Sequence, residues 1–353
     1  MNKSSLILKF FQKAHLLTVI NPAYCQTIST LFKWMIDNDQ IHRDITTQFL
    51  NLKSTTIAKI ISREDATTAG IEEITYLLKK ITHLSFSPYK KDGEKIKKNQ
   101  TIAEIKGQAS EILGFERTIL NILQRMSGIA TATNRLINLI NVGDAKEGSQ
   151  IPASPALSPS KVEGDFEDVS GKLSRQDPLL IAATRKTPWM SLDKKAVAVG
   201  GGLTHRLNLS DGILIKDNHL ANISVAEALK TVFNKVKGEL IEIEVKNEKE
   251  AISALTTYQK LTTYNLQPTT LRPCSGRAYN YLAILLDNFH PENAARTIEK
   301  LKQQFDLSQI IFEASGGINK ENIKKWAKTG VNLISIGFLT HSPQAVNLSL
   351  EFS

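Results

Sequence analysis

The alternation of apolar and polar positions divides the chain into two parts with different rhythms. In the first third, residues 57–64 predict a strand and residues 71–81 repeat apolar side chains at helical spacing. Two strand-like segments, 94–96 and 101–105, flank a turn, and a long amphipathic helix extends from Ile112 to Met126. These elements predict a small α+β unit at the start of the chain.

The rest of the chain repeats a short apolar strand, a polar or glycine tip and a helix. The expected strands are 179–183, 212–215, 241–245, 283–286, 310–313 and 333–336. Repeated strand–helix units imply a parallel sheet, and this many within one region favour a barrel over an open sheet. In such barrels the carboxyl ends of the strands carry the active site.

Two segments interrupt this rhythm. Residues 143–177 are rich in proline, serine, glycine and charge, and they hold too little apolar surface to offset the entropy lost on ordering. We expect a mobile loop there. Residues 262–281, with Pro268 and Pro273, form a second irregular insertion. Both precede an expected strand, so we expect both on the face opposite the active site.

Composition narrows the class of protein. The 353 residues are 41% hydrophobic, enough for a sizeable core, and no run approaches the roughly 18 apolar residues of a membrane span. The two cysteines, Cys25 and Cys274, suit a reducing compartment, so we expect a cytoplasmic protein without membrane contact. A net charge of +9 is compatible with nucleic-acid binding. However, the densest run of basic residues, 90–98, contains Asp92 and Glu94 and lacks aromatic stacking partners. We therefore expect no nucleic-acid partner.

Basic residues gather instead at three consecutive strand ends. These ends carry Arg185-Lys186, His205-Arg206 and Lys216. Arginine grips a carboxylate with two parallel hydrogen bonds, and lysine adds a compact charge. Any one of them alone is more often a surface or ion-paired cation. All five together at strand ends indicate a site for a small polyanion.

Acids and glycines complete the pattern. Alternation places Glu242 and Glu244 on one face of their strand, so at least one carboxylate should point into the barrel, and Asp287 ends the next strand. Such acids can hold sugar hydroxyls or magnesium, or they can pair with the nearby cations. The last two strands end in Ser315-Gly316-Gly317 and Ser335-Ile336-Gly337, where glycine lets backbone N–H groups approach a phosphate.

Taken in order, these motifs resemble the quinolinate phosphoribosyltransferase family, of the type II phosphoribosyltransferases, from Asp44 to the end of the chain. The other segments typical of that family are Arg63-Glu64-Asp65 with Gly70, Glu116 to Asn121, Leu123 to Thr131, Glu313 to Ile318 and Gly337 to Ser342. The resemblance implies an α/β fold with an N-terminal α/β sandwich domain and a C-terminal open, TIM-like α/β barrel. The division it implies is 1–126 for the first domain, with a divergent extension at 1–43, and 127–341 for the barrel, while 342–353 packs back on the first domain.

The resemblance also implies the roles of the residues. Lys186, Glu244 and Asp287 would act in catalysis, and Glu244 and Asp287 would hold Mg²⁺ through pyrophosphate or water. The substrates would bind to Arg117 from the partner of a homodimer, and to Thr184, Arg185, Lys186, His205, Arg206, Lys216, Glu244 and Asp287. Residues Ser315, Gly316, Gly317, Ser335, Ile336 and Gly337 would hold the 5-phosphate.

The implied reaction joins quinolinate to phosphoribosyl pyrophosphate with loss of carbon dioxide, giving nicotinate mononucleotide for de novo NAD biosynthesis. Two alternatives stay open: a related phosphoribosyltransferase-like protein of the molybdenum-transport type, acting on another aromatic acid, and a non-catalytic anion-binding relative. His205-Arg206 and Lys216 favour quinolinate over the first, and acids inside a cationic pocket speak against the second. The chain departs from the family at Ala183, where an acid is usual, and at Pro188-Trp189-Met190, which replaces a Pro-Gly segment.

Overall fold

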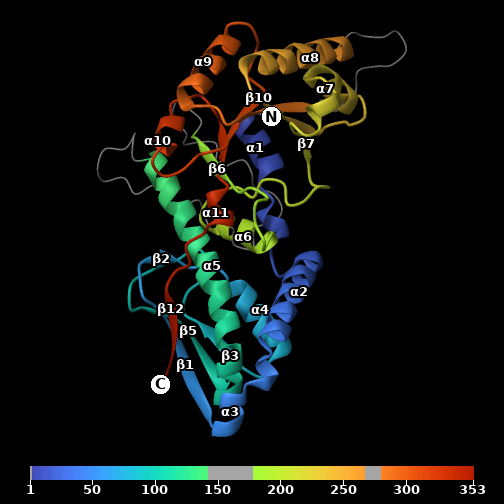
Figure 1. Cartoon of the computed structure of the whole chain (residues 1–353). Helices are drawn as coiled ribbons and strands as arrows, with labels where there is room; N and C mark the ends of the chain where they lie inside the picture. The colour runs from blue at the N-terminus through green and yellow to red at the C-terminus, as the bar shows by residue number, and fades with distance from the viewer. Residues whose placement is uncertain (1, 142–177, 267–279) are drawn as a thin grey trace.

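The computed structural model describes residues 2–141, 178–266 and 280–353, which form two domains joined by one long helix (Figure 1). The N-terminal domain is built on an antiparallel sheet in the order β12-β1-β5-β3, beside the pair β2-β4. These strands are β1 (Thr55–Ser62), β2 (Ala66–Thr67), β3 (Ser85–Pro88), β4 (Lys95–Ile96), β5 (Thr101–Gln108) and β12 (Leu348–Phe352). Its helices are α2 (Pro22–Asp39), α3 (Ile45–Leu50), α4 (Ile71–Ile81) and the first part of α5 (Ala109–Asn141).

The second domain is a parallel sheet in the order β6-β11-β10-β9-β8-β7. Its strands are β6 (Leu180–Ala182), β7 (Ile213–Ile215), β8 (Leu240–Val245), β9 (Tyr281–Asp287), β10 (Ile310–Ser315) and β11 (Leu333–Ser335). A parallel bridge between Ala182 and Leu203 adds one more segment at the free edge of β6. The helices are α6 (Ser191–Val199), α7 (Val225–Phe233), α8 (Glu248–Leu266), α9 (Pro291–Lys302), α10 (Ile323–Trp326) and α11 (Phe338–His341).

The strands of the barrel are buried on both faces. All six residues of β8 are buried, as expected for a strand with helices outside and packed side chains inside. The inner face of β8 alternates Leu240, Glu242 and Glu244, so an apolar side chain lies at the amino end and acids lie toward the carboxyl end. The predicted α/β fold with a TIM-like barrel is therefore confirmed, and all six expected strands are present.

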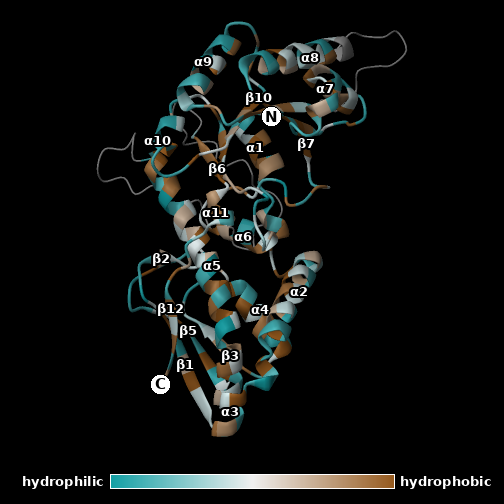
Figure 2. Cartoon of the chain, in the orientation of Figure 1, coloured by the Kyte–Doolittle hydropathy of each residue, from teal (hydrophilic) through white to brown (hydrophobic). Residues whose placement is uncertain are grey.

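The first helix, α1 (Lys3–Phe11), lies inside the barrel domain, in dark blue near the label N in Figure 1. The predicted division assigned residues 1–43 to the N-terminal domain, and α1 departs from it. The reason is apolar burial: Leu6, Ile7 and Phe11 are almost completely buried against side chains of the barrel strands. In Figure 2 the α1 ribbon is mostly brown, whereas α9 on the outside of the barrel is largely teal.

The far end of the chain returns to the N-terminal domain. Strand β12 pairs antiparallel with β1, from Ala58 opposite Phe352 to Ser62 opposite Leu348. Of the predicted irregular insertion at 262–281, residues 262–266 are helical and belong to α8, Tyr281 begins β9, and 267–279 lie outside the described residues. The insertion predicted at 143–177 lies entirely outside the described residues. None of the described helices is long and apolar enough to span a membrane.

Candidate active site

The strand register brings the predicted polar ends to one level. Ser315 lies opposite Asp287 on one side and opposite Ser335 on the other, and Ser335 lies opposite Ala182. Because all these strands are parallel, their carboxyl ends meet at one edge of the barrel. We call this edge the mouth; it comprises Thr184–Lys186, Lys216, Glu244, Asp287, Ser315–Gly317 and Ser335–Gly337.

The cations of the mouth have few partners of their own. Arg185 and Lys186 are exposed, and among the described residues no hydrogen bond or ion pair holds the Arg185 guanidinium. Lys216 Nζ lies 3.4 Å from Glu244 Oε2. Burial lowers the pKa of Arg206; the charge of Glu242 opposes this shift, and the positive charge of Arg185 adds to it. The mouth therefore carries positive charge that the protein does not fully neutralise.

The segment carrying Arg185 and Lys186 is anchored from below. The carbonyl of Lys186 accepts the hydroxyl of Thr340 at 2.9 Å, and Thr187 donates to the carboxylate of Asp193. Arg125 grips Asp193 with two hydrogen bonds of 2.8 Å. Its guanidinium also lies over the ring of Trp189, 5.0 Å from the centroid. Trp189 thus has a packing role in the Pro188–Met190 stretch, where the sequence departs from the family pattern.

The two mouth acids offer hard oxygen donors from neighbouring strands. Glu244 on β8 pairs in register with Leu285, so Asp287 lies two residues further along β9 on the same inward face. Asp287 Oδ2 accepts a hydrogen bond of 2.7 Å from the side chain of Asn288. Two carboxylates on one face suit Mg²⁺, which is usually held by one or two carboxylates together with substrate phosphates. The residues present fit the ion.

The glycine end of β10 is shaped by close approach. Gly316 has φ +94°, and a Cβ there would lie 2.1 Å from Asn288 Oδ1, so no larger residue fits. Gly317 has φ +64° and would meet nothing within 4 Å. Open space beside a left-handed glycine leaves room for a ligand against the backbone. On β11 the amide of Ile336 is already used, since it donates to the carbonyl of Ala182 at 3.1 Å.

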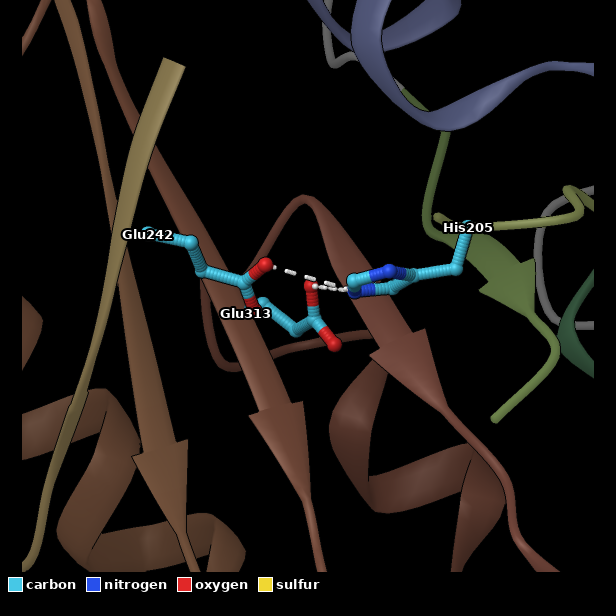
Figure 3. A group of neighbouring side chains, drawn as sticks. All are labelled: His205, Glu242 and Glu313. Carbon is cyan, nitrogen blue, oxygen red and sulfur yellow. Dashed lines mark ion pairs between the residues drawn. The ribbon is translucent and has the colours of Figure 1, made fainter. Parts of the chain in front are cut away.

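His205 lies below the mouth instead of lining it. Its ring is buried and points between Glu242 of β8 and Glu313 of β10, with Nε2 at 3.4 Å and 3.3 Å from their carboxylates (Figure 3). Glu313 also accepts the hydroxyl of Ser335. We call His205, Glu242 and Glu313 the buried triad. Arg206, the next residue, is half-buried, and its guanidinium donates to the carbonyl of Gly212 at 3.4 Å.

Protons decide the chemistry of the buried triad. Burial and the charge of Glu313 raise the pKa of Glu242 to about 7. Burial lowers the pKa of His205, but the charges of Glu313 and Glu242 outweigh burial and raise this pKa to about 9. Because Nδ1 accepts the amide N–H of Arg206 at 2.8 Å, a ring proton lies on Nε2 and faces the two carboxylates. Histidine, with two glutamates, could otherwise hold a metal ion; a proton on Nε2 disfavours that use.

Sequence reasoning missed part of this arrangement. Glu313 was read only as part of a glycine-bearing strand end, although its spacing of two from Ser315 already placed it on the inward face. Lys194 in α6 was not singled out either. It is fully buried and donates to the carbonyl of Thr204 at 2.7 Å. Burial and the charge of Arg185 lower its pKa to about 7. No sequence signal marks such a lysine, because a helix surface normally exposes it.

Arg117 lies apart from the mouth within one chain. It is exposed on the N-terminal part of α5, 3.6 Å from Glu116, and its neighbour Phe115 stacks on Phe32 in the N-terminal domain. The predicted contact of Arg117 with substrate therefore requires a second chain.

The fold and the mouth define a class of protein: a two-domain α/β barrel protein with clustered cations and two acids at the carboxyl ends of its strands. The model of the family "Quinolinate phosphoribosyl transferase, N-terminal domain" matches residues 44–127, and that of the C-terminal domain matches residues 170–351. The chain belongs to the quinolinate phosphoribosyltransferase family, as the sequence motifs predicted.

Individual relatives agree with the family models. A probable nicotinate-nucleotide pyrophosphorylase (carboxylating) of Methanothermobacter thermautotrophicus is 32% identical over 326 residues, covering 91% of this chain and 97% of the relative. A chloroplastic nicotinate-nucleotide pyrophosphorylase of Arabidopsis thaliana is 31% identical and covers 83% of this chain and 73% of the relative. The solved structure of the Francisella tularensis nicotinate-nucleotide pyrophosphorylase superposes with a TM-score of 0.70 at 27% identity, covering 93% of this chain and 96% of that one.

Proposed function

We propose that the chain transfers the phosphoribosyl group of phosphoribosyl pyrophosphate to quinolinate and releases pyrophosphate and carbon dioxide, forming nicotinate mononucleotide for NAD biosynthesis. The observation that carries this proposal is the mouth itself, where unneutralised cations surround two inward carboxylates. Quinolinate brings two carboxylates, and the sugar donor brings a phosphate and a pyrophosphate. These anions match the cations, and the acids match the positive charge that develops on the sugar.

The residues suggest how the reaction proceeds. Arg185, Arg206 and Lys216 would bind the two carboxylates of quinolinate and orient its ring nitrogen toward the anomeric carbon of the sugar. That nitrogen forms the new C–N bond while the bond to pyrophosphate breaks, and Lys186 would stabilise the leaving oxygen. Glu244 and Asp287 would oppose the oxocarbenium-like charge on the ribose. The resulting pyridinium nitrogen accepts the electron pair as the adjacent carboxylate leaves as carbon dioxide, and a proton then takes its place.

Magnesium and the phosphate site complete the assignment. Mg²⁺ bound by Glu244 and Asp287, directly or through water, would neutralise the pyrophosphate. The open backbone at Gly317, with the ends of β10 and β11, would hold the 5-phosphate. Thr184, whose hydroxyl accepts the amide of Lys186 at 3.1 Å, would keep Lys186 in place. The free thiol of Cys25 suits the reducing cytoplasm, where we place this activity.

The direct test is incubation of the protein with quinolinate, phosphoribosyl pyrophosphate and MgCl₂, with chromatography for nicotinate mononucleotide and trapping of ¹⁴C-labelled carbon dioxide from the 2-carboxylate. We expect equal amounts of the two products. Binding of quinolinate without turnover would support a non-catalytic relative, and turnover of another aromatic acid in its place would support the molybdenum-transport type.

We further propose a homodimer in which Arg117 of each chain completes the mouth of its partner. Arg117 is exposed and distant from its own barrel. The N-terminal domain also exposes Phe49 (88%), Ile45 (66%) and Leu50 (63%) on and around α3, an apolar surface suited to an interface.

Mixed subunits test the shared site. Arg117→Ala and Arg185→Ala should each be inactive alone, because each removes one part of every mouth. After unfolding and refolding together, half of a random dimer population carries one intact mouth, so about a quarter of wild-type activity should return. A mixture that stays inactive while sedimenting as a dimer would contradict the exchange of Arg117.

A further inference from the structure

The N-terminal helix α1 occupies the interior of the barrel at the amino ends of the strands. Leu6, Ile7 and Phe11 are buried, with 2% or less of their surface exposed. The apolar partners on the barrel side are Ala182, Leu203, Leu240, Ala283, Ile311 and Leu333. These side chains come from five strands and from the added segment at Leu203, so α1 closes the barrel from below. Both family models leave α1 outside their matches.

The end of α1 also holds the segment that leads to Arg206. The carbonyl of Phe11 accepts the amide of His205 at 2.8 Å and the hydroxyl of Thr204 at 3.2 Å. The amide of Lys13 in turn donates to Thr204 Oγ1 at 2.8 Å. Gln12 Nε2 donates to the carbonyl of Gly202 at 3.3 Å. Residues 202–205 are thus bound to residues 11–13 by four hydrogen bonds, two through the backbone and two through the Thr204 hydroxyl.

His205 is in an unusual backbone conformation that these contacts support. Its φ is +53°, in the left-handed region that residues other than glycine adopt only when their surroundings enforce it. The ring packs edge-on against Phe11, with centroids 4.9 Å apart. In Figure 3 the blue α1 ribbon lies beside the buried triad. The direction of the chain at Arg206 follows from this conformation, because Arg206 is the next residue and its amide donates to the His205 ring.

We propose that α1 is a positioning element for substrate binding: Phe11, through its carbonyl, its ring and the Thr204 hydroxyl, fixes the backbone at His205 and thereby the position of Arg206, whose guanidinium donates to the carbonyl of Gly212 at 3.4 Å. The inference rests on the proposed function, since Arg206 is there assigned to quinolinate. It adds residues 11–13 and Thr204 to those on which recognition of the pyridine substrate depends, although none of them reaches the mouth.

A matched pair of substitutions tests the inference. Thr204→Val keeps the shape of the side chain but removes both hydrogen bonds to residues 11 and 13, whereas Thr204→Ser keeps them. We expect Thr204→Val to raise KM for quinolinate on the order of tenfold and to change KM for phosphoribosyl pyrophosphate less than twofold. Thr204→Ser should stay close to wild type. Ile298→Ala on α9, a buried residue on the outer side of the barrel, controls for a general loss of stability.

Hydrogen exchange supplies a readout that needs no substrate. Thr204→Val and Phe11→Ala should both speed amide exchange at residues 202–206, and Ile298→Ala should not. Unchanged exchange in Thr204→Val would overturn the proposal. Faster exchange with a normal KM for quinolinate would show that α1 stabilises the barrel without directing Arg206, and would overturn it as well. If wild-type protein has no turnover, the proposed function fails by itself, and the exchange rates still decide whether α1 holds this segment.

Discussion

Lys194 and Lys195 are neighbours in α6, yet they lie in opposite electrostatic environments. Lys194 faces the barrel, where burial and the charge of Arg185 lower its pKa to about 7. Lys195 faces the N-terminal domain, where burial is outweighed by Glu73, Asp92 and Glu72, so its pKa is raised. One helix therefore borders a region with surplus positive charge and a region that balances its own charges.

The charged groups around Lys195 serve the structure, whereas those of the mouth are available for binding. Near Lys195, Nζ lies 2.8 Å from Glu73, which also accepts the hydroxyl of Tyr24 at 2.7 Å. These contacts join α6 to α4 and α2 with no ligand. In the mouth Lys216 has Glu244 beside it, but among the described residues the charged groups of Arg185 and Lys186 have no such partner, so bound anions would balance them. A protein gains stability from the first arrangement and gives up stability for the second.

The largest expected effect is on activity at the mouth. Arg185→Ala removes the exposed guanidinium without breaking an internal contact, so turnover should fall by roughly a thousandfold or more while the melting temperature stays within about 2 °C. Steady-state kinetics and calorimetry measure both. Arg296→Ala, an exposed arginine on α9, is the matched control and should be fully active. Near-normal activity of Arg185→Ala would remove the basis of the site assignment.

Near Lys195 we expect the opposite result, a loss of stability with little change in activity. Lys195→Met leaves Glu72 and Glu73 without their cation in a buried contact, which should lower the free energy of unfolding by about 3–5 kcal/mol. Urea denaturation measures this change. Activity per folded molecule should stay close to normal at low temperature. A variant as stable as wild type would show that the contact between the domains does not depend on this lysine.

At Lys194 we expect a substitution to raise the free energy of unfolding instead of lowering it. The ordinary pKa of lysine is near 10.5 and that of Lys194 is about 7 in the fold, so wild-type stability falls as pH drops from about 10 to about 7. Lys194→Met removes this loss but leaves the Thr204 carbonyl without its donor, so the net gain at pH 7 should be on the order of 1–2 kcal/mol. The gain should shrink toward pH 10. A gain independent of pH would contradict the lowered pKa.

The smallest expected effect lies away from both regions. The family models match 44–127 and 170–351, so residues 148–168 fall outside them. Their excision, with a short glycine-serine bridge, should leave kcat and both KM values within about twofold, since the expected position is opposite the mouth. Loss of activity without loss of folding would show that this segment contributes to the site.

Much of the fold was predictable because burial imposes a period. The helix at 71–81 agrees in both bounds with α4, and each expected barrel strand lies within two residues of an observed one. The spacing of apolar residues alone does not predict which charged residue is buried. Lys194 looks like a surface residue of a helix in the sequence, yet it is fully buried in the folded barrel. The depth of His205 also depends on tertiary contacts with Phe11, 194 residues earlier in the chain.

The location of α1 was not predictable for a related reason. Its apolar residues mark an amphipathic helix, but many surfaces could accept them, and local sequence does not choose among partners more than 150 residues away. The family resemblance did not help, because it began at Asp44.

The pairing of β12 with β1 sets the order in which the molecule can be completed. Ala58 faces Phe352, so the edge of the first sheet is closed by a strand that is synthesised only after the strands of the barrel. Until then β1 presents one unpaired row of backbone groups during synthesis, the kind of edge that recruits other strands. The barrel likewise needs both α1, which precedes the N-terminal domain in the chain, and β11, which follows it. Neither domain is a contiguous piece of the nascent chain, and each is completed only after segments of the other have been synthesised.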